Sequence, residues 1–240
     1  MASKTAMITI AGRPNVGKST LTNRLVGEKV AIVSHKPQTT RNRICGIVNR
    51  GELQFVFVDT PGFHKPRTKL GDYMVSVTRQ SVAQVDAVLL MVEPIANVGP
   101  QEEALLEECT QFAQEGPHLF PADMTSDQPE RQMMAEIIRE KLLWCLDREV
   151  PHGTAVEVTR FSERDNGIID LEATIYCEKA SHKGIIIGKQ GAMLKKISTM
   201  ARIDCEKFMG TKVFLTTWVK VKENWRDSDF LIRNFGYQDT

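Results

Sequence analysis

The sequence predicts an α/β domain with a mostly parallel sheet, followed by an α+β domain. Three features of the sequence support this prediction. Apolar runs alternate with helix-like segments in the first hundred residues, strand-like alternation surrounds a helical stretch in the second half, and a proline-rich stretch separates the two. Alternating strands and helices favour a parallel sheet that binds its ligand at the carboxyl ends of the strands.

The first domain is expected to contain four strands, over 7–12, 43–51, 52–60 and Asp86–Val92. A helix over 18–27 follows the first strand, and a turn at Arg50-Gly51 joins the second to the third. The run Asp86–Val92 is continuously apolar, which is typical of a central strand covered on both faces.

An interdomain linker is predicted over Gln114–Glu130, which contains three prolines and a glycine. The predicted domains are therefore residues 1–113 and 131–240, with residues 114–130 between them. Asp127 is expected to cap the helix that follows, with Pro129 near its first turn.

The second domain is expected to contain helices over 130–150 and Lys183–Met209 and strands over 154–161, 169–178 and 211–221. Trp144, on the first of these helices, and Trp218, on the last strand, are expected in the core. Trp225 is equally compatible with core packing and with a surface patch that includes Lys220 and Lys222.

Composition excludes several classes of protein. The net charge is +1, so any nucleic-acid site must be a local basic patch. The five cysteines include no C-x-x-C pair, which indicates reduced thiols and no zinc site. No apolar run is long enough to span a membrane, and the start of the chain resembles no secretory or transit peptide. A cytoplasmic protein is expected.

The segment GRPNVGKST fits the phosphate-binding loop G-x-x-x-x-G-K-[ST] and lies between a predicted strand and a predicted helix. In such a loop, backbone N–H groups and the helix N-terminus converge on phosphate oxygens. Lys18 would neutralise the β- and γ-phosphates, and Ser19 would contact Mg²⁺. The nucleotide-binding residues predicted here are Gly12, Arg13, Pro14, Asn15, Val16, Gly17, Lys18, Ser19 and Thr20.

The segment FVFVDTPG supplies a second part of the same site. Asp59 ends a strand, where its carboxylate reaches the Mg²⁺ shell, and the Gly62 N–H faces the γ-phosphate. Thr60 and Pro61 lie between them and are predicted to contact nucleotide. In the polar segment KPQTTRN, Thr39 or Thr40 could close on Mg²⁺. The predicted catalytic residues are Lys18, Thr40, Asp59 and Gly62, and the predicted Mg²⁺ ligands are Ser19, Thr40 and Asp59.

The segment GKQG, Gly188–Gly191, fits the G-x-x-G loop of KH domains, in which two glycines let the backbone approach RNA closely. Basic residues surround this loop, and there is no acidic residue from Lys179 to Arg202. The RNA-binding residues predicted here are Lys183, Ile185, Ile186, Ile187, Gly188, Lys189, Gln190, Gly191, Lys195 and Lys196. The three isoleucines are expected to form an apolar groove wall.

These motifs together resemble the Era family of GTPases. The resemblance rests on GRPNVGKSTLTNRLVG, SHKPQTTRNRICGI and VFVDTPGFHKP, and continues through EGPHLFPADMTSDQPER, AEIIREKLL, EVPHGTAVEV, KGIIIGKQGAMLKKI and WVKVKENWRDSD. It implies a P-loop GTPase domain followed by a type II KH domain, with GTP or GDP and Mg²⁺ as ligands. It also implies binding to the 3′ end of 16S rRNA, assistance in 30S subunit assembly and no DNA partner. A cytoplasmic protein that can lie peripherally at the inner membrane face is implied.

The resemblance bears on hydrolysis. Many GTPases carry a glutamine after D-x-x-G that orients the attacking water. Here that position is Phe63, which cannot do so. Relatives of this kind recruit K⁺ through an asparagine in the phosphate loop. Asn15 could act as that ligand, or it could cap the turn.

One part of the family pattern is missing. The sequence contains neither an Asn-Lys dipeptide nor a Ser-Ala dipeptide, so it lacks the N-K-x-D and Ser-Ala-Lys segments that read guanine. About a third of the GTPase domain is absent, and a junction is expected near Leu105–Cys109, within 105–112. The leading interpretation is a GTP-hydrolysing switch; the alternative is a non-enzymatic KH RNA-binding protein with a truncated nucleotide domain.

Overall fold

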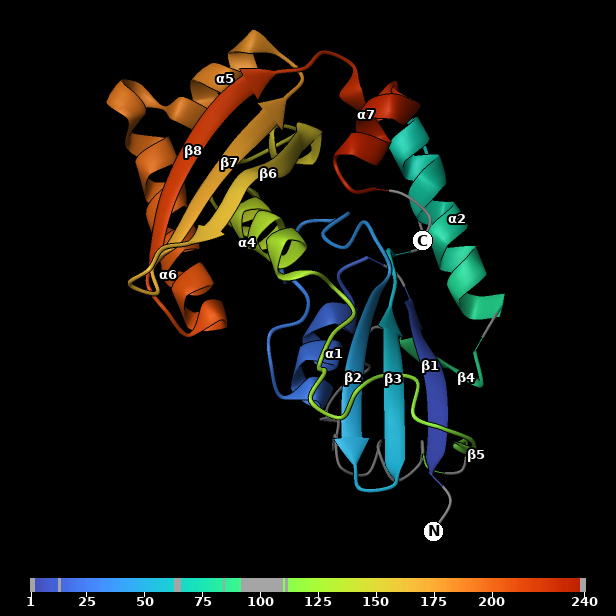
Figure 1. Ribbon diagram of the computed structural model, residues 1–240. Coiled ribbons are helices and arrows are strands. Elements are labelled where there is room, and N and C mark those ends of the chain that lie inside the picture. Colours follow the sequence, from blue (N-terminus) through green and yellow to red (C-terminus); the bar gives the residue numbers. More distant parts are fainter. Residues whose placement is uncertain are drawn as a thin grey trace, which may run out of the picture. The chain divides into compact units, whose positions relative to one another are not determined.

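The computed structural model describes residues 3–12, 14–62, 66–83, 85–91, 110 and 112–237 (Figure 1). Contacts between residues divide the chain into two compact units between Gln128 and Pro129, with Thr68–Leu70 grouped with the second unit. Each unit has its own sheet and its own apolar core.

The first unit contains the predicted mostly parallel sheet. Its strands follow the order β2-β3-β1-β4. Their bounds are β1 Lys4–Gly12, β2 Ile44–Arg50, β3 Leu53–Asp59 and β4 Ala87–Met91. β1 is parallel to both β3 and β4, and β2 forms an antiparallel hairpin with β3. The short strand β5, Gln114–Glu115, pairs antiparallel with the beginning of β1.

Helices complete the first unit. They are α1, Lys18–Val26, and α2, Lys69–Ala83. Leu21 and Leu25 of α1 pack with Ile8, Ile10 and Phe57 on one face of the sheet. Because α1 follows β1 directly, this packing fixes the loop between them at the carboxyl end of the sheet.

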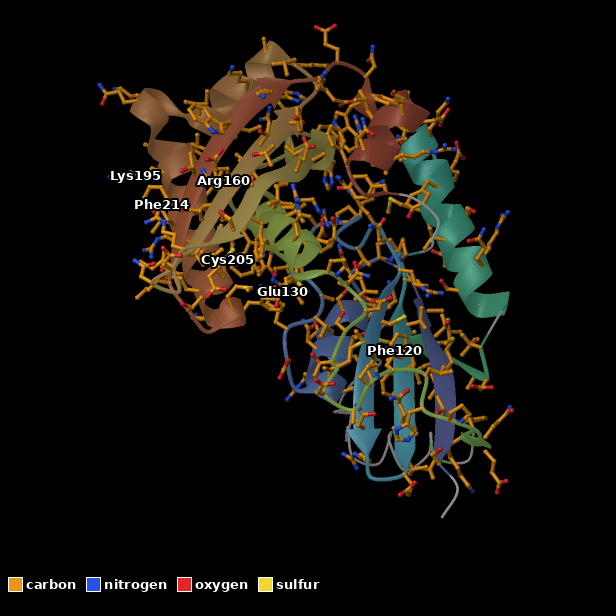
Figure 2. The ribbon with its side chains drawn as sticks, viewed as in Figure 1. Phe120, Glu130, Arg160, Lys195, Cys205 and Phe214 are labelled. Carbon is orange, nitrogen blue, oxygen red and sulfur yellow. The ribbon has the colours of Figure 1, made fainter. Side chains whose placement is uncertain are left out.

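The segment predicted as a linker packs on the first unit and is not a free tether. The backbone N–H of Ile47 donates to the carbonyl of Thr125, and Ser126 forms an antiparallel bridge with Gly46. The Phe120 ring packs beside Val56 and Val58 on the opposite face from α1 (Figure 2). Residues 117–128 therefore form a strap that covers the β2 edge. The division between the two units, at Gln128 and Pro129, falls within the predicted linker.

Asp127 belongs to this strap and does not cap the next helix. Its Oδ1 accepts the backbone N–H of Cys45 at 2.9 Å. The helix α4, Glu130–Cys145, begins after Pro129 without a side-chain cap. The capping prediction is therefore wrong. The carboxylate that the local pattern assigns to the start of α4 binds instead to the N–H of a residue in β2.

Gln54 holds the strap through its buried side-chain amide. Its Oε1 accepts the N–H groups of Leu119 (2.7 Å) and Phe120 (3.0 Å). Its Nε2 donates to the Phe120 carbonyl and to Asn49 Oδ1, both at 2.8 Å. The side chain is fully buried, so each of these bonds replaces water that the groups would otherwise have.

Replacing Gln54 with leucine should lower the free energy of unfolding of the first unit by about 2–4 kcal/mol, because the strap groups would lose their partners inside the protein. Urea denaturation measures this change, and hydrogen exchange at Leu119 and Phe120 should accelerate. Gln114→Ala, at an exposed glutamine of β5 outside the strap, is the control and should change stability by less than about 0.5 kcal/mol. A Gln54→Leu protein as stable as the control would contradict this account of the strap.

The second unit contains a three-stranded sheet in the order β6-β7-β8. The strands are β6 Thr154–Glu163, β7 Ile169–Cys177 and β8 Val213–Val221. The helices are α4, α5 Ala180–Ile187, α6 Ala192–Met209 and α7 Asp229–Asn234, with single 3₁₀ turns at Pro151–Gly153, Lys189–Gly191 and Trp225–Asp227. β6 is antiparallel and β8 parallel to β7, so the predicted α+β fold is confirmed.

The core of the second unit lies on one face of this sheet. Register pairs Val156 with Ile175 and Ile175 with Val219, and all three are buried in one cluster with residues of α4 and α6. Because side chains alternate along a strand, the residues next to these three in each strand point to the opposite face of the sheet. Trp218 is one of these and is 58% exposed.

Two of the three tryptophan predictions need correction. Trp218 and Trp144 are both exposed, Trp144 at 50%, and the Lys141 ammonium lies 3.7 Å from the centre of the Trp144 ring. Trp225 is fully buried, and its Nε1 donates to the Gly153 carbonyl at 2.9 Å. Trp225 therefore takes the packing role and does not extend a surface patch.

Candidate nucleotide site and RNA-binding loop

The phosphate loop connects β1 to α1, as predicted. A Cβ added at Gly12 would lie 2.5 Å from the Met91 carbonyl oxygen, and one added at Gly62 would lie 2.7 Å from the Pro14 nitrogen. Asn15 and Gly17 adopt positive φ angles of 65° and 95°. These positions show a tightly turned loop against which the Gly62 backbone is pressed. Arg13 lies outside the described residues.

Lys18 begins α1 and is almost completely buried. Its Nζ donates to the Gly12 carbonyl at 3.3 Å, which directs the ammonium back along the loop. Burial lowers the pKa of Lys18, and the nearby Asp59 charge opposes this shift. A desolvated ammonium beside the phosphate loop is suited to contact a phosphate.

Three predicted metal ligands converge beside this loop. Ser19 Oγ donates to Asp59 Oδ2 at 2.6 Å and lies 2.9 Å from Thr40 Oγ1. Thr40 Oγ1 also donates to Asp59 Oδ2, at 3.4 Å. Thr40 therefore lies beside Ser19 and Asp59, whereas the hydroxyl of Thr39 donates to the Lys36 carbonyl.

Asp59 shows that the cluster fits Mg²⁺. The residue is fully buried, yet its Oδ1 has no hydrogen-bond partner among the described residues. A buried carboxylate oxygen without a partner is costly unless an ion or water fills the position. Carboxylate and hydroxyl oxygens are the ligands that Mg²⁺ takes in nucleotide sites. Elsewhere in the described parts of the chain, no group of three His, Cys, Asp or Glu side chains could hold a metal.

Hydroxyl groups fix the segment after Asp59. Thr60 Oγ1 donates to the Ile10 carbonyl at 3.1 Å, and Thr78 Oγ1 of α2 donates to the Pro61 carbonyl at 2.9 Å. These bonds anchor the backbone that presents Gly62 to the phosphate loop. Phe63 lies outside the described residues.

A pocket joins these parts. Its lining includes most of the predicted phosphate-loop residues together with Thr40 and Gly62. The lining also includes Gln38 of the KPQTTRN segment and four residues before it that were not predicted to belong to the site, Ile32, Val33, Ser34 and His35. Asn15 Nδ2 donates to the His35 carbonyl at 2.8 Å, which ties this segment to the loop. The side chains of this segment follow no phosphate-binding pattern, so sequence spacing alone could not identify them.

The protonation of Asp59 provides a test of the cluster. Burial raises the pKa of Asp59 from 3.8 to about 6, and the hydrogen bond from Ser19 and the charge of Lys18 oppose this shift. Between these two pH values the folded protein holds a proton that the unfolded chain has lost. The free energy of unfolding without ligand should therefore fall as pH rises through this window, by up to about 3 kcal/mol.

Denaturation of Asp59→Asn over the same pH range is the matched measurement, because asparagine cannot titrate. Its profile should be flatter than that of the wild type between pH 4 and about 6. Since Mg²⁺ requires the carboxylate, the affinity of the wild type for Mg²⁺ with nucleotide should rise over the same range. Identical pH profiles for the two proteins would exclude the buried carboxyl as the titrating group.

The GKQG loop lies between α5 and α6 in the second unit. Gly188 has a φ of 72°, and a Cβ there would lie 2.7 Å from Met193 Cβ, whereas a Cβ at Gly191 would meet open space. Lys189 and Gln190 are exposed at the tip, and Gln190 has a left-handed φ of 52°. The loop therefore presents the Lys189 ammonium and the Gln190 amide at its tip. Gly188, before them, has no room for a side chain, whereas Gly191, after them, faces open space.

The predicted groove wall needs one correction. Ile185 is half exposed, and Ile187 packs partly against the core. Ile186 is fully buried within that core, so its side chain cannot contact a base. Lys195 and Lys196, on the first turns of α6, are exposed, and Lys183 on α5 is half-buried. A single helical turn cannot place three consecutive side chains on one face, which is why the isoleucines divide.

Comparisons with known proteins agree with both halves of this description. A family model described as "50S ribosome-binding GTPase" matches residues 7–121, and a KH domain model matches residues 149–226. GTPase Era from Ruminiclostridium cellulolyticum is 43% identical, with 99% of each chain covered. GTPase Era from Clostridium kluyveri is 45% identical, with 98% of this chain and 99% of the relative covered. This chain belongs to the Era GTPase family.

Two solved Era structures also match. Aquifex aeolicus Era bound to GDP·AlF₄⁻ has a TM-score of 0.92 and 32% identity, covering 98% of this chain and all of that one. Era in complex with MgGDPNP and nucleotides 1506–1542 of 16S rRNA has a TM-score of 0.90 and 31% identity, covering 99% of this chain and all of that one.

The same comparisons bear on the missing segment. The alignment with the R. cellulolyticum protein extends over 294 positions, 54 more than the 240 residues of this Era chain. Relatives therefore carry residues that have no counterpart here. In the first unit, Val88 and Leu90 of β4 are 46% and 65% exposed, although Leu89 between them packs in the core. An apolar strand exposed on one face is what the loss of a covering segment would leave. The predicted junction at Leu105–Cys109 lies outside the described residues.

Proposed function

We propose that this chain binds GTP with Mg²⁺, hydrolyses it to GDP and phosphate, and binds the 3′ end of 16S rRNA during assembly of the 30S subunit. The observation that carries the proposal is a pocket lined by Lys18, Ser19 and Thr40. The buried Asp59 accepts hydrogen bonds from Ser19 and Thr40 behind it, in a chain that also presents the GKQG loop. The Era structure that holds both MgGDPNP and 16S rRNA nucleotides supports the same combination.

The residues of the pocket have separate tasks in hydrolysis. The Lys18 ammonium would neutralise the β- and γ-phosphates, and the Gly62 N–H would donate to the γ-phosphate. Mg²⁺ held by Ser19 and Thr40, with Asp59 behind them, would neutralise charge on the phosphate oxygens. Thr40 follows the segment whose His35 carbonyl accepts a hydrogen bond from Asn15 of the phosphate loop. The position of Thr40 would therefore depend on whether the γ-phosphate is present. Positioning and electrostatics account for most of the catalysis expected in such a site.

Two finer elements belong to this proposal. Asn15 lies in the loop position at which relatives of this kind hold K⁺, and its side-chain oxygen is a suitable ligand. Faster GTP hydrolysis in K⁺ than in Na⁺ would support this role. A cytoplasmic location with peripheral membrane contact is the second element. None of the helices in the described ranges is both long and apolar enough to span a membrane.

Base selectivity should be weak in this chain. The described pocket lining consists of phosphate-loop residues, residues 32–35 and 38–40, and Gly62. The sequence lacks the N-K-x-D segment that reads guanine. Discrimination by factors on the order of 10⁴ requires buried polar groups that the wrong base leaves unpaired. GTP and ATP should therefore compete within about tenfold of each other, as measured by displacement of a fluorescent triphosphate. A preference for GTP on the order of 10³ or more would show that another segment reads the base.

Binding of RNA tests the other half of the proposal. The probe is an RNA with the sequence of nucleotides 1506–1542 of 16S rRNA, and the control is a scrambled RNA of equal length. Fluorescence anisotropy should show tighter binding to the rRNA sequence, with affinity that falls as salt rises. Equal affinity for both RNAs at every salt concentration would contradict specific recognition.

A further inference from the structure

One hydrogen bond joins α2 to the segment that carries Thr40. The hydroxyl of Tyr73, near the start of the helix, donates to Asn42 Oδ1 at 3.0 Å. Asn42 is two residues after Thr40 and two residues before Ile44, where β2 begins. Both side chains of the bond are half-buried, so water competes with it only in part. The bond therefore restrains the chain between the nucleotide pocket and the sheet.

The same helix is joined to the segment that presents Gly62. Thr78 Oγ1 is buried and donates to the Pro61 carbonyl at 2.9 Å. Farther along the helix, the Ser81 carbonyl accepts the hydroxyl of Thr9 in β1 at 2.6 Å. α2 is thus fixed both to the strand that leads into the phosphate loop and to the backbone just before Gly62.

The two segments that α2 joins are the ones expected to meet the γ-phosphate. The Gly62 N–H would donate to that phosphate, and Thr40 would bind the Mg²⁺ beside it. Thr40 and Gly62 both line the described pocket, whereas Tyr73 and Asn42 are not among its lining residues. The bond between Tyr73 and Asn42 would therefore act on the nucleotide through Thr40.

We propose that the hydrogen bond from Tyr73 to Asn42 holds Thr40 in position for the γ-phosphate and Mg²⁺, which makes Tyr73 a positioning residue for hydrolysis. This inference rests on the proposed GTP hydrolysis and adds to it a residue outside the pocket. With the bond intact, Thr40 and Gly62 are restrained by one helix before the triphosphate binds. Without the bond, Thr40 has to be ordered at each binding event, which costs affinity. A diphosphate has no γ-phosphate, so its affinity should not depend on the bond.

The test compares the affinities of the full chain for GDPNP and for GDP, both with Mg²⁺, by isothermal titration. Tyr73→Phe removes only the hydroxyl. It should weaken GDPNP binding by about 2- to 10-fold, the size expected for one neutral hydrogen bond, and leave GDP affinity unchanged. Its kcat for GTP should fall by about 10- to 100-fold with a smaller change in KM, since small misplacements of reacting groups have effects of this size.

Three further variants show whether the bond itself is responsible. Asn42→Ala removes the acceptor and should reproduce the effects of Tyr73→Phe. The double variant should be no weaker than either single variant, because all three proteins lack the same bond. Tyr176→Phe is the matched control, since the Tyr176 hydroxyl donates to Glu157 Oε2 at 2.8 Å in the second unit. It should leave both affinities and kcat unchanged.

The outcomes separate this inference from the function on which it rests. If the wild type releases phosphate and Tyr73→Phe matches it in GDPNP affinity and in kcat, the positioning role is wrong and the proposed function stands. Equal losses of GDPNP and GDP affinity in Tyr73→Phe would also overturn the inference, because they would show a general loss of structure. Additive losses in the double variant would overturn it as well, since they would show two independent effects. If the wild type neither binds GDPNP nor releases phosphate, the proposed function and this inference fail together.

Discussion

Lys18→Ala is expected to lower the affinity for Mg²⁺ and triphosphate by at least about 100-fold, since charge-assisted hydrogen bonds contribute about 1.5–3 kcal/mol each. The ammonium is buried and directed along the phosphate loop, so no mobile surface lysine can replace it. RNA affinity should stay within about twofold, because the RNA site lies in a separate unit with its own core. Isothermal titration with GTP and anisotropy with RNA give both values on the same preparation.

Lys4→Ala is the matched control for this substitution. Lys4 is an exposed lysine at the start of β1, the end of the strand opposite the phosphate loop. Its removal should leave nucleotide affinity unchanged. Equal losses of nucleotide and RNA binding in Lys18→Ala, with the circular dichroism spectrum preserved, would show that the two sites are not independent.

Lys189→Asp combined with Gln190→Asp is expected to lower RNA affinity by about 100-fold or more. The variant replaces the two exposed residues at the tip of the loop and adds two negative charges next to the phosphates. Aspartate tolerates the left-handed backbone that Gln190 adopts, so the loop should keep its shape. Changing Gly188 instead would test folding, because a Cβ there meets Met193.

Lys212→Asp controls for the change in overall charge. Lys212 is exposed beyond the far end of α6, an 18-residue helix of about 27 Å that begins at the loop. It should reduce affinity only slightly, and less as salt rises. Lys195→Ala with Lys196→Ala should give an intermediate loss and flatten the salt slope by roughly 1.4. If the loop variant binds RNA as tightly as the wild type, the RNA site lies elsewhere.

The strands and the phosphate site could be predicted because their signals are local. β1, β3 and β4 are apolar runs. Lys18 and Ser19 follow β1, and Asp59 ends β3, at the spacing that phosphate and Mg²⁺ chemistry requires. A motif of this kind sets its own backbone geometry. The contacts among Ser19, Thr40 and Asp59 follow from it once the strands pair in parallel.

The strap could not be predicted because its stability depends on distant partners. Gln54 is a polar residue within an apolar strand, and its four hydrogen bonds include three with residues 65 or 66 positions later in the chain. Prolines in the segment suggest a linker. They also favour an extended backbone in the residues before them, and an extended backbone can lie along β2. Asp127 illustrates the same limit. The local pattern predicts that it caps α4, but its carboxylate accepts the N–H of the distant Cys45 instead.

The exposed tryptophans show a different limit. Alternation along β8 places Trp218 on one face but does not say which face the helices cover. In this sheet α4 and α6 cover the face that carries Val213 and Val219. Ile186 could not be separated from Ile185 for a similar reason, because the polar residues of this short helix precede its three isoleucines and do not mark which of them is buried.

Release of inorganic phosphate from Mg²⁺·GTP by the 240-residue chain, with and without the 16S rRNA fragment 1506–1542, tests the central claim most directly. The wild type should release phosphate with saturable kinetics, and Lys18→Ala and Asp59→Asn should lose this release while both variants still bind RNA. Release by the wild type no faster than by Asp59→Asn, under conditions in which both proteins are folded and bind RNA, would contradict the claim that these residues form a hydrolytic site.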